Sequence, residues 1–112
     1  INLNLDIIKY FIDKLELNTK IVMSSNFKTD LYGLDKILFL LNELKATHYI
    51  SGEGEGSKRY IDESKFQINN IKLIWQNYIH PVYLQQHSDF ISHLSILDLV
   101  FNEGPNSKQF LL

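Results

Sequence analysis

The 112-residue sequence predicts an α/β fold, with a small, mostly parallel sheet and flanking helices. Two stretches repeat apolar residues at helical spacing, and short runs rich in β-branched residues follow them. Hydrophobic residues make up 45% of the chain and charged residues 21%, as in an ordinary globular protein. A chain of this length fits one small domain, so we expect a single α/β domain over residues 1–112.

The first predicted helix spans residues 4–17, with Asn4 as its N-cap. Its apolar positions share one stripe: Leu5, Ile8, Phe11, Ile12 and Leu15. A strand is predicted over residues 20–23, where β-branched Ile21 and Val22 lie side by side. The polar residues 24–26 then end that strand in a turn.

The second predicted helix spans residues 30–45 and carries a stripe of leucine and isoleucine, with Thr29 or Asp30 as its cap. Gly33 costs about 1 kcal/mol relative to alanine inside a helix, which favours a later start. Residues 47–51 form the next predicted strand, ending at Gly52. Strand, helix and strand in this order predict a parallel pair joined by a right-handed crossover.

The remaining elements lie in the second half of the chain. A strand is predicted over residues 71–75, followed by an irregular stretch over residues 80–90. A short helix is predicted over residues 95–102, closed by Gly104 and Pro105.

Composition excludes several classes of function. The formal charge of −2 gives no electrostatic basis for binding nucleic acid. The absence of cysteine excludes disulfides, thiolate zinc sites and cysteine nucleophiles. No apolar run approaches the ~20 residues that cross a bilayer. We therefore expect a cytoplasmic protein without a membrane partner.

A glycine-rich stretch at residues 51–59 follows a predicted strand, where open parallel sheets place their ligand crevice. Neither a dinucleotide fingerprint nor a P-loop fits its spacing. Two interpretations stay open: a surface loop, or a cradle for an anionic group. The residues of that cradle would be Ser51, Gly52, Gly54 and Gly56.

The histidines are the candidates for proton transfer, because the imidazole pKa lies near neutrality. His48 lies on a predicted strand, and His80 and His87 lie in the irregular stretch. Together with His93 and an acidic residue these side chains could bind zinc, but their spacing matches no compact ligand set, and we expect no metal.

The predicted helix at residues 95–102 places Ser95, Asp98 and Asn102 on one face. That face either lines a crevice or belongs to a plain amphipathic helix capped by Ser95. In the crevice, Asp98 would be a catalytic residue, and Ser95, Asn102 and Glu103 would bind the substrate. Aromatic residues are frequent in the second half and either build the core or line a sugar or base pocket. Tyr60 is the substrate-binding candidate among them.

Several ordered motifs resemble the WbqC-like protein family of bacteria. They are Ala-Thr-His-Tyr-Ile-Ser-Gly at 46–52, Tyr-Ile-Asp-Glu at 60–63, His-Pro-Val-Tyr at 80–83, Gln86-His87 and Leu-Ser-Ile-Leu-Asp-Leu-Val-Phe-Asn-Glu-Gly-Pro at 94–105. An aromatic- and proline-rich opening motif of that family has no counterpart here. The resemblance therefore implies the C-terminal part of a Rossmann-like or nucleotidyltransferase-like domain.

The resemblance implies a role in bacterial surface polysaccharide, including O-antigen, with transfer of an amino acid such as glycine to a sugar. The substrate would be a nucleotide sugar or an activated amino acid, and the cofactor is unknown. We expect this portion alone to be inactive and to form homo-oligomers through exposed apolar faces. A non-enzymatic binding or assembly module is the alternative.

Overall fold

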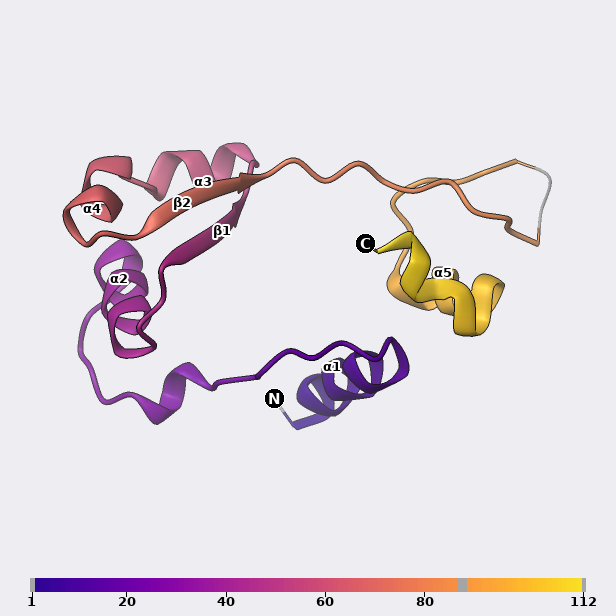
Figure 1. The fold of residues 1–112 in the computed structure, drawn as a ribbon, viewed down its shortest axis with the longest axis horizontal. Coiled ribbons are helices and arrows are strands. Elements are labelled where there is room, and N and C mark those ends of the chain that lie inside the picture. Colours follow the sequence, from indigo (N-terminus) through magenta and orange to yellow (C-terminus); the bar gives the residue numbers. More distant parts are fainter. Residues whose placement is uncertain (1, 87–88, 112) are drawn as a thin grey trace. The chain divides into compact units, whose positions relative to one another are not determined.

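The computed structural model describes residues 2–86 and 89–111. Its elements, in chain order, are α1 (Asn2–Lys14), a 3₁₀ helix (Ser24–Asn26), α2 (Gly33–Glu43), β1 (His48–Gly52), α3 (Glu55–Tyr60), α4 (Glu63–Ile68), β2 (Lys72–Gln76), α5 (Ile96–Glu103) and a second 3₁₀ helix (Gly104–Phe110) (Figure 1). Helices combined with a small parallel sheet confirm the α/β class. The chain divides into two compact units, residues 22–78 and residues 1–21 together with 79–112.

The unit of residues 22–78 contains the sheet. Strands β1 and β2 run parallel, with Ser51 opposite Trp75 and Gly52 opposite Gln76 (Figure 1). A parallel pair needs a long connection from the end of one strand to the start of the next, and α3 and α4 form that connection. The carboxyl ends of both strands therefore lie at the same edge of the sheet.

The core of this unit forms where α2 and α4 meet the sheet. Its buried members are Leu38 from α2, Phe66 from α4 and Ile71 just before β2. The Phe66 ring is 1% exposed and stacks on Tyr49 of β1 with ring centroids 5.4 Å apart. Five partly buried side chains complete the cluster: Leu34, Leu41, Tyr49, Ile61 and Leu73.

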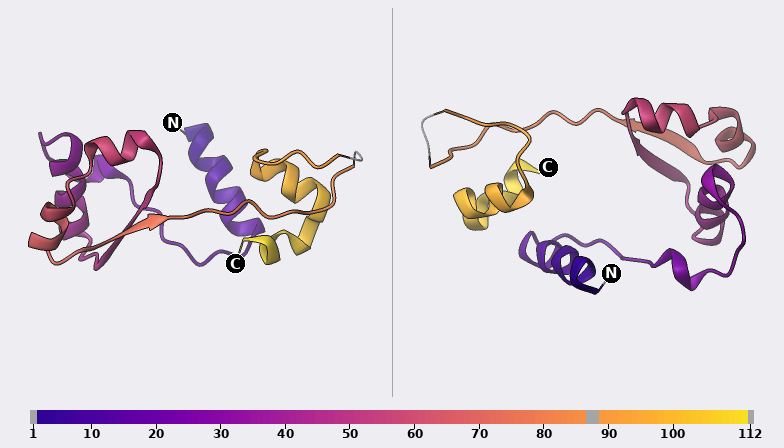
Figure 2. Two further views of the ribbon diagram at one scale, coloured as in Figure 1. Left: turned by 90° about the horizontal axis from the view of Figure 1, so that it is seen from above. Right: turned by 180° about the vertical axis from the view of Figure 1, so that it is seen from behind.

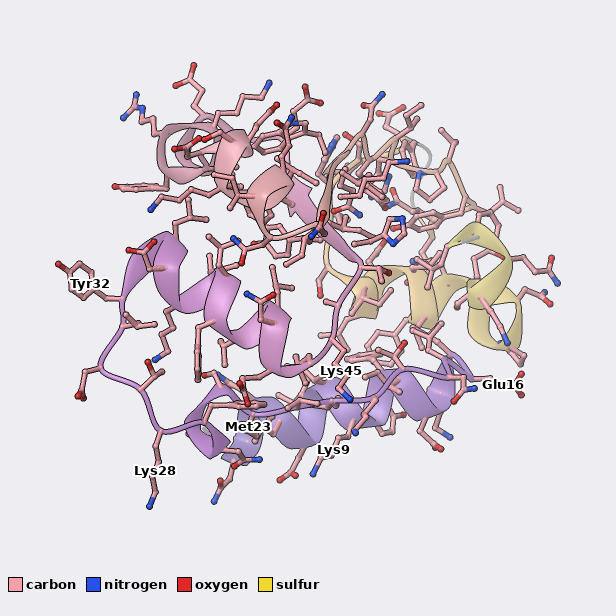
Figure 3. All side chains as sticks on the ribbon, turned by 60° about the vertical axis from the view of Figure 1, so that its left-hand side comes forward. Lys9, Glu16, Met23, Lys28, Tyr32 and Lys45 are labelled. Atoms are coloured by element: carbon pink, nitrogen blue, oxygen red, sulfur yellow. The ribbon has the colours of Figure 1, made fainter. Side chains whose placement is uncertain are left out.

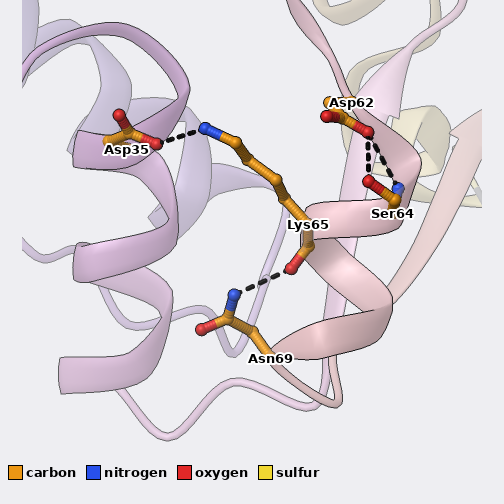
Figure 4. Close-up of polar contacts among 5 residues, drawn as sticks. All are labelled: Asp35, Asp62, Ser64, Lys65 and Asn69. Atoms are coloured by element: carbon orange, nitrogen blue, oxygen red, sulfur yellow. Dashed lines mark hydrogen bonds and ion pairs between the residues drawn. The ribbon is translucent and has the colours of Figure 1, made fainter.

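Polar contacts hold α4 in place at its start and along its side (Figure 4). Asp62 caps the helix, because its Oδ1 accepts hydrogen bonds from the Ser64 hydroxyl at 2.6 Å and the Ser64 amide at 3.1 Å. These two bonds lower the pKa of Asp62. Lys65 Nζ lies 2.7 Å from Asp35 Oδ1 of α2, and this hydrogen-bonded carboxylate raises the pKa of Lys65.

Three helices end in the same way, with a residue in the left-handed region two positions after the last helical residue. Lys45 follows α2 with φ 53°, and the Lys45 and Ala46 amides donate back to the carbonyls of Asn42 and Leu41. This pair of bonds is a Schellman motif. Glu16 after α1 and Asn70 after α4 adopt the same conformation with the same pair of bonds. None of the three residues is glycine, which usually occupies this position.

The unit of residues 1–21 and 79–112 is built on α1, α5 and the second 3₁₀ helix. Figure 2 shows α5 continuing directly into that 3₁₀ helix. The buried apolar residues of this unit include Leu15, directly after α1, and Leu99 of α5. Lys108 Nζ donates to the Glu16 carbonyl at 3.2 Å, so the segment after α1 is tied to the second 3₁₀ helix.

Some predicted boundaries were wrong. Helix α1 begins at Asn2, so Asn4 lies inside the helix and is not its cap. Helix α2 begins at Gly33 and not at residue 30, as expected from the cost of glycine in a helix interior. Its N-cap is therefore Tyr32 and not Thr29 or Asp30. Tyr32 points outward from the ribbon and makes no cap (Figure 3).

The strand predicted over residues 20–23 was also wrong. Residues 20–23 have no regular structure, and β1 pairs with β2 instead. Two β-branched residues are too few to overcome the lack of a hydrogen-bonded neighbour, since an unpaired strand leaves its backbone groups to water. Helix α4 was not predicted. In the part of the chain that the structure describes, no helix is long and apolar enough to span a bilayer.

Candidate functional site

The predicted site residues fall into two groups, one in each compact unit. The first group surrounds the carboxyl end of β1. Ser51 and Gly52 end that strand, Gly54 is the N-cap of α3, and Gly56 lies within α3. Tyr60 is the last residue of α3 and is exposed. Half of the predicted glycine loop is therefore helical.

The geometry around β1 does not present free cations to a ligand. Lys58 Nζ lies 3.0 Å from Glu53 Oε1, and Arg59 lies 3.7 Å from Glu55 Oε2. Ser51 is buried, and its Oγ lies 3.4 Å from the Gly52 carbonyl. Exposed ion pairs of this kind are weak, so a strongly bound anion can still displace them.

His48 lies at the opposite end of the same strand. It is the first residue of β1, and at about 3.3 Å per residue it is roughly 13 Å from Gly52. Its Nδ1 lies 2.9 Å from the Thr47 hydroxyl. The structure therefore does not bring His48 together with the glycine-rich stretch.

The second group is centred on Asp98, in the first turn of α5. Its Oδ2 accepts hydrogen bonds from the Tyr83 hydroxyl at 2.8 Å and from Gln85 Nε2 at 2.9 Å. Its Oδ1 accepts from Asn102 Nδ2 at 3.1 Å, and this amide also donates to the Asp98 carbonyl at 2.8 Å. A carboxylate with donors on both oxygens is held in one orientation, which suits a residue that positions its neighbours.

Gln85 links the Asp98 network to the backbone of Ile91. Its Oε1 accepts from the Ile91 amide at 2.8 Å, while its Nε2 donates to the Ile91 carbonyl at 3.0 Å. Together with the bond to Asp98, these contacts occupy both amide hydrogens of Gln85. The Gln85 side-chain amide therefore forms two hydrogen bonds with the Ile91 backbone, as the backbone of a neighbouring strand would.

Ser95 and Glu103 make structural contacts at the two ends of α5. Ser95 Oγ accepts from the Leu97 amide at 3.3 Å and caps the helix. Glu103 Oε1 accepts from the Leu84 amide at 3.2 Å. The cap that the sequence predicts at Ser95 is confirmed.

His80 lies in an aromatic cluster near the network. Its ring centroid is 5.0 Å from that of His93 and 5.9 Å from that of Phe90, and Phe90 packs edge-on against Tyr83. The His80 Nδ1 lies 2.8 Å from the Pro81 carbonyl, which can only accept, so Nδ1 carries a proton. His87, the other predicted base in this stretch, lies outside the described residues.

A pocket of about 440 Å³ opens beside the Asp98 network. The residues that line it are Gln85, Gln86, Asp89, Ile91, Leu94, Asp98, Phe101 and Asn102. The structure thus brings the predicted Asp98 and Asn102 together at one cavity, while Ser95, Glu103 and His80 are not part of its lining.

Sequence reasoning missed six of these lining residues. Phe101 carried a usable signal, since it lies three residues after Asp98 on the same helix and therefore on a neighbouring face. The residues before α5 have irregular backbone, so no periodicity places them next to that helix. Among the residues that the structure describes, no three histidine or acidic side chains gather closely enough to hold a metal ion.

These features define a small α/β protein with a pocket of mixed polar and apolar lining at its last α-helix. The chain belongs to the WbqC-like protein family, whose model matches residues 1–110, and the resemblance seen in the motifs is confirmed.

The chain is also similar to the uncharacterised protein Rv1507c of Mycobacterium tuberculosis, with 29% identity over 98 residues. That match covers 87% of this chain and 42% of the length of the mycobacterial protein. No solved structure matches the chain.

Proposed function

We propose that this chain contributes a substrate pocket to a transferase of bacterial surface polysaccharide synthesis, including O-antigen, that moves an amino acid such as glycine onto a sugar. The observation that best supports the proposal is the pocket beside Asp98. Its volume of about 440 Å³ lies within the range of small-molecule sites, roughly 300–1,000 Å³.

The lining of the pocket suits a sugar or an amino acid. Amide and carboxyl groups give the pocket polar lining, and Ile91, Leu94 and Phe101 give it apolar lining. Sugars need this combination, because their hydroxyl groups form hydrogen bonds while their C–H faces pack on apolar and aromatic surfaces. Phe101 is 83% exposed and is therefore accessible to a ligand from solvent.

In this proposal Asp98 is a positioning residue. Tyr83, Gln85 and Asn102 all donate to its carboxylate, so it holds the pocket wall rather than exchanging protons with a substrate. The activated donor would be bound elsewhere, beside the glycine-rich stretch. Its phosphates would have to displace Glu53 and Glu55 from their weak, exposed ion pairs with Lys58 and Arg59.

An NMR titration tests the proposal directly. Glucose and glycine are added to the labelled chain, and we expect saturable shifts of the side-chain amides of Gln85 and Asn102. The Phe101→Ala variant should weaken glucose binding about tenfold, since it removes apolar contact with the C–H face of the sugar that is worth roughly 1–2 kcal/mol. Tyr32→Ala is the matched control, because Tyr32 is 87% exposed and lies in the other unit. Unchanged spectra with both compounds would contradict the proposal.

A non-enzymatic assembly module is the second candidate function. The segment before the Asp98 network exposes large apolar side chains, namely Ile79, Val82 and Leu84. Exposed apolar groups close together in the chain favour association with a partner surface. Sedimentation velocity at increasing concentration tests this candidate, and a Val82→Ser, Leu84→Ser double variant should abolish any association. A monomer at all concentrations would reject self-assembly.

A further inference from the structure

We propose that the pocket beside α5 selects a ligand that carries a primary ammonium group next to an apolar surface, and that it rejects phosphate. This inference rests on the proposed function, in which the pocket holds a small polar substrate. The inference specifies, beyond the proposed function, the charge and the hydrogen-bonding groups of the ligand that the pocket recognises.

The charges around the pocket have one sign. Asp89 and Asp98 line it, and no lysine or arginine does so among the described residues. The salt bridges that the structure describes do not involve either aspartate. A phosphate entering this pocket would face carboxylates without a compensating cation, so anions are disfavoured there.

The hydrogen-bonding capacity that remains in the pocket is mostly that of acceptors. Both amide hydrogens of Asn102 are engaged by Asp98, which leaves Asn102 Oδ1 as an acceptor. Gln85 Nε2 donates its hydrogens to the Ile91 carbonyl and to Asp98 Oδ2. Asp98 Oδ1 receives a single bond and keeps a second lone pair. Among the described residues, none hydrogen-bonds to the side chain of Asp89 or of Gln86, so the Asp89 carboxylate adds acceptors and Gln86 adds the amide donors of the lining.

A primary ammonium group fits this balance. It offers three N–H donors and no acceptor, and it carries the charge opposite to that of the two aspartates. The exposed Phe101 ring on the same pocket adds a face that attracts cations. Ile91 and Leu94 can pack against the carbon skeleton that bears the ammonium group.

The test compares two sugars of nearly the same shape, glucosamine and glucose, at about pH 6, where the amine is protonated. Binding is measured by NMR titration of the Gln85 and Asn102 side-chain amides. We expect glucosamine to bind about fivefold more tightly than glucose, the size of effect that an exposed ion pair supports. Inorganic phosphate should cause no saturable shift of these amides.

The Asp89→Asn variant isolates the charge. Asp89 is exposed, so the variant keeps the fold, and the preference for glucosamine should fall about three- to fivefold while glucose affinity stays the same. Asp30→Asn makes the same change of charge in the other unit and should leave the preference intact.

The outcomes separate this inference from the proposed function. Equal binding of the two sugars, or saturable binding of phosphate, would overturn the inference and leave the sugar pocket standing. An absence of binding by both sugars would overturn the proposed function and this inference with it.

Discussion

The Tyr83 hydroxyl donates a hydrogen bond to the Asp98 carboxylate at 2.8 Å, and this contact joins the irregular segment before α5 to the first turn of the helix. Tyr83 is buried and Asp98 is partly buried, so the bond is partly shielded from water. The position of Asp98 is also favourable for a carboxylate, because the amino end of a helix carries partial positive charge. One buried hydroxyl thus fixes the residue on which Gln85 and Asn102 converge.

Replacing Tyr83 with phenylalanine removes this bond and keeps the ring. We expect the free energy of unfolding to fall by about 1 kcal/mol, the net value of a typical hydrogen bond. Urea denaturation followed by fluorescence measures the change. Tyr32→Phe is the control, because the exposed Tyr32 makes no cap for α2. Equal stability of the two variants would show that the Tyr83 bond contributes nothing.

Phe66 is the central residue of the core in residues 22–78. Phe66→Ala removes a side chain that is almost fully buried and stacked on Tyr49, so we expect a loss of about 3–5 kcal/mol. Ile71→Val leaves a smaller void in the same core and should cost about 0.5–1.5 kcal/mol. Denaturant titrations of both variants check this order, and a smaller loss in the alanine variant would contradict the packing described.

Lys45 occupies the left-handed position after α2 with φ 53°. This conformation costs a residue with a Cβ about 1–2 kcal/mol, part of which glycine gives back through greater freedom of the unfolded chain. We expect Lys45→Gly to raise stability by about 0.5–1 kcal/mol. Lys36→Gly, inside the same helix, should lower it by about 1 kcal/mol. Thermal melts of the two variants should therefore shift in opposite directions, and parallel shifts would disprove the assignment.

The Asp62–Ser64 cap makes stability depend on acid pH. Because the folded pKa of Asp62 lies below its unfolded value, its contribution is complete above about pH 4 and is lost as the pH falls through the folded pKa. Ser64→Ala removes the hydroxyl that lowers this pKa most. We expect the variant to be less stable at neutral pH and to converge with the parent as the pH falls through the folded pKa of Asp62. Melting curves between neutral and acid pH measure this, and a constant difference across that range would contradict it.

Elements with strong local signals were predictable from the sequence. The leucine stripe of α2, the strand before Gly52 and the Ser95 cap of α5 all correspond to elements of the structure. Helix α4 was not predictable, because only Phe66 in its six residues is buried and a short helix has little periodicity. The run at Ile21 and Val22 failed as a strand for the opposite reason, since local propensity cannot supply a neighbouring strand.

The candidate site was predictable on the helix and not on the loop. Asp98 and Asn102 follow from helical spacing, and both line the pocket. Gln85 reaches Asp98 through side-chain hydrogen bonds across an irregular segment, and such contacts leave no repeating pattern in the sequence. The histidines drew attention by their chemistry, but the described ones take no part in the lining of that pocket.

The Lys108–Glu16 contact joins residues that lie 92 positions apart, so it can form only after Lys108 has been synthesised. Residues 22–78 form one continuous stretch and can fold as soon as they leave the ribosome. Residues 1–21 emerge earlier but belong with residues 79–112, so α1 must wait for the last part of the chain. The pocket-bearing unit is therefore completed after the sheet-bearing unit, and a chain halted before residue 79 would hold the sheet while α1 still lacked residues 79–112 to pack against.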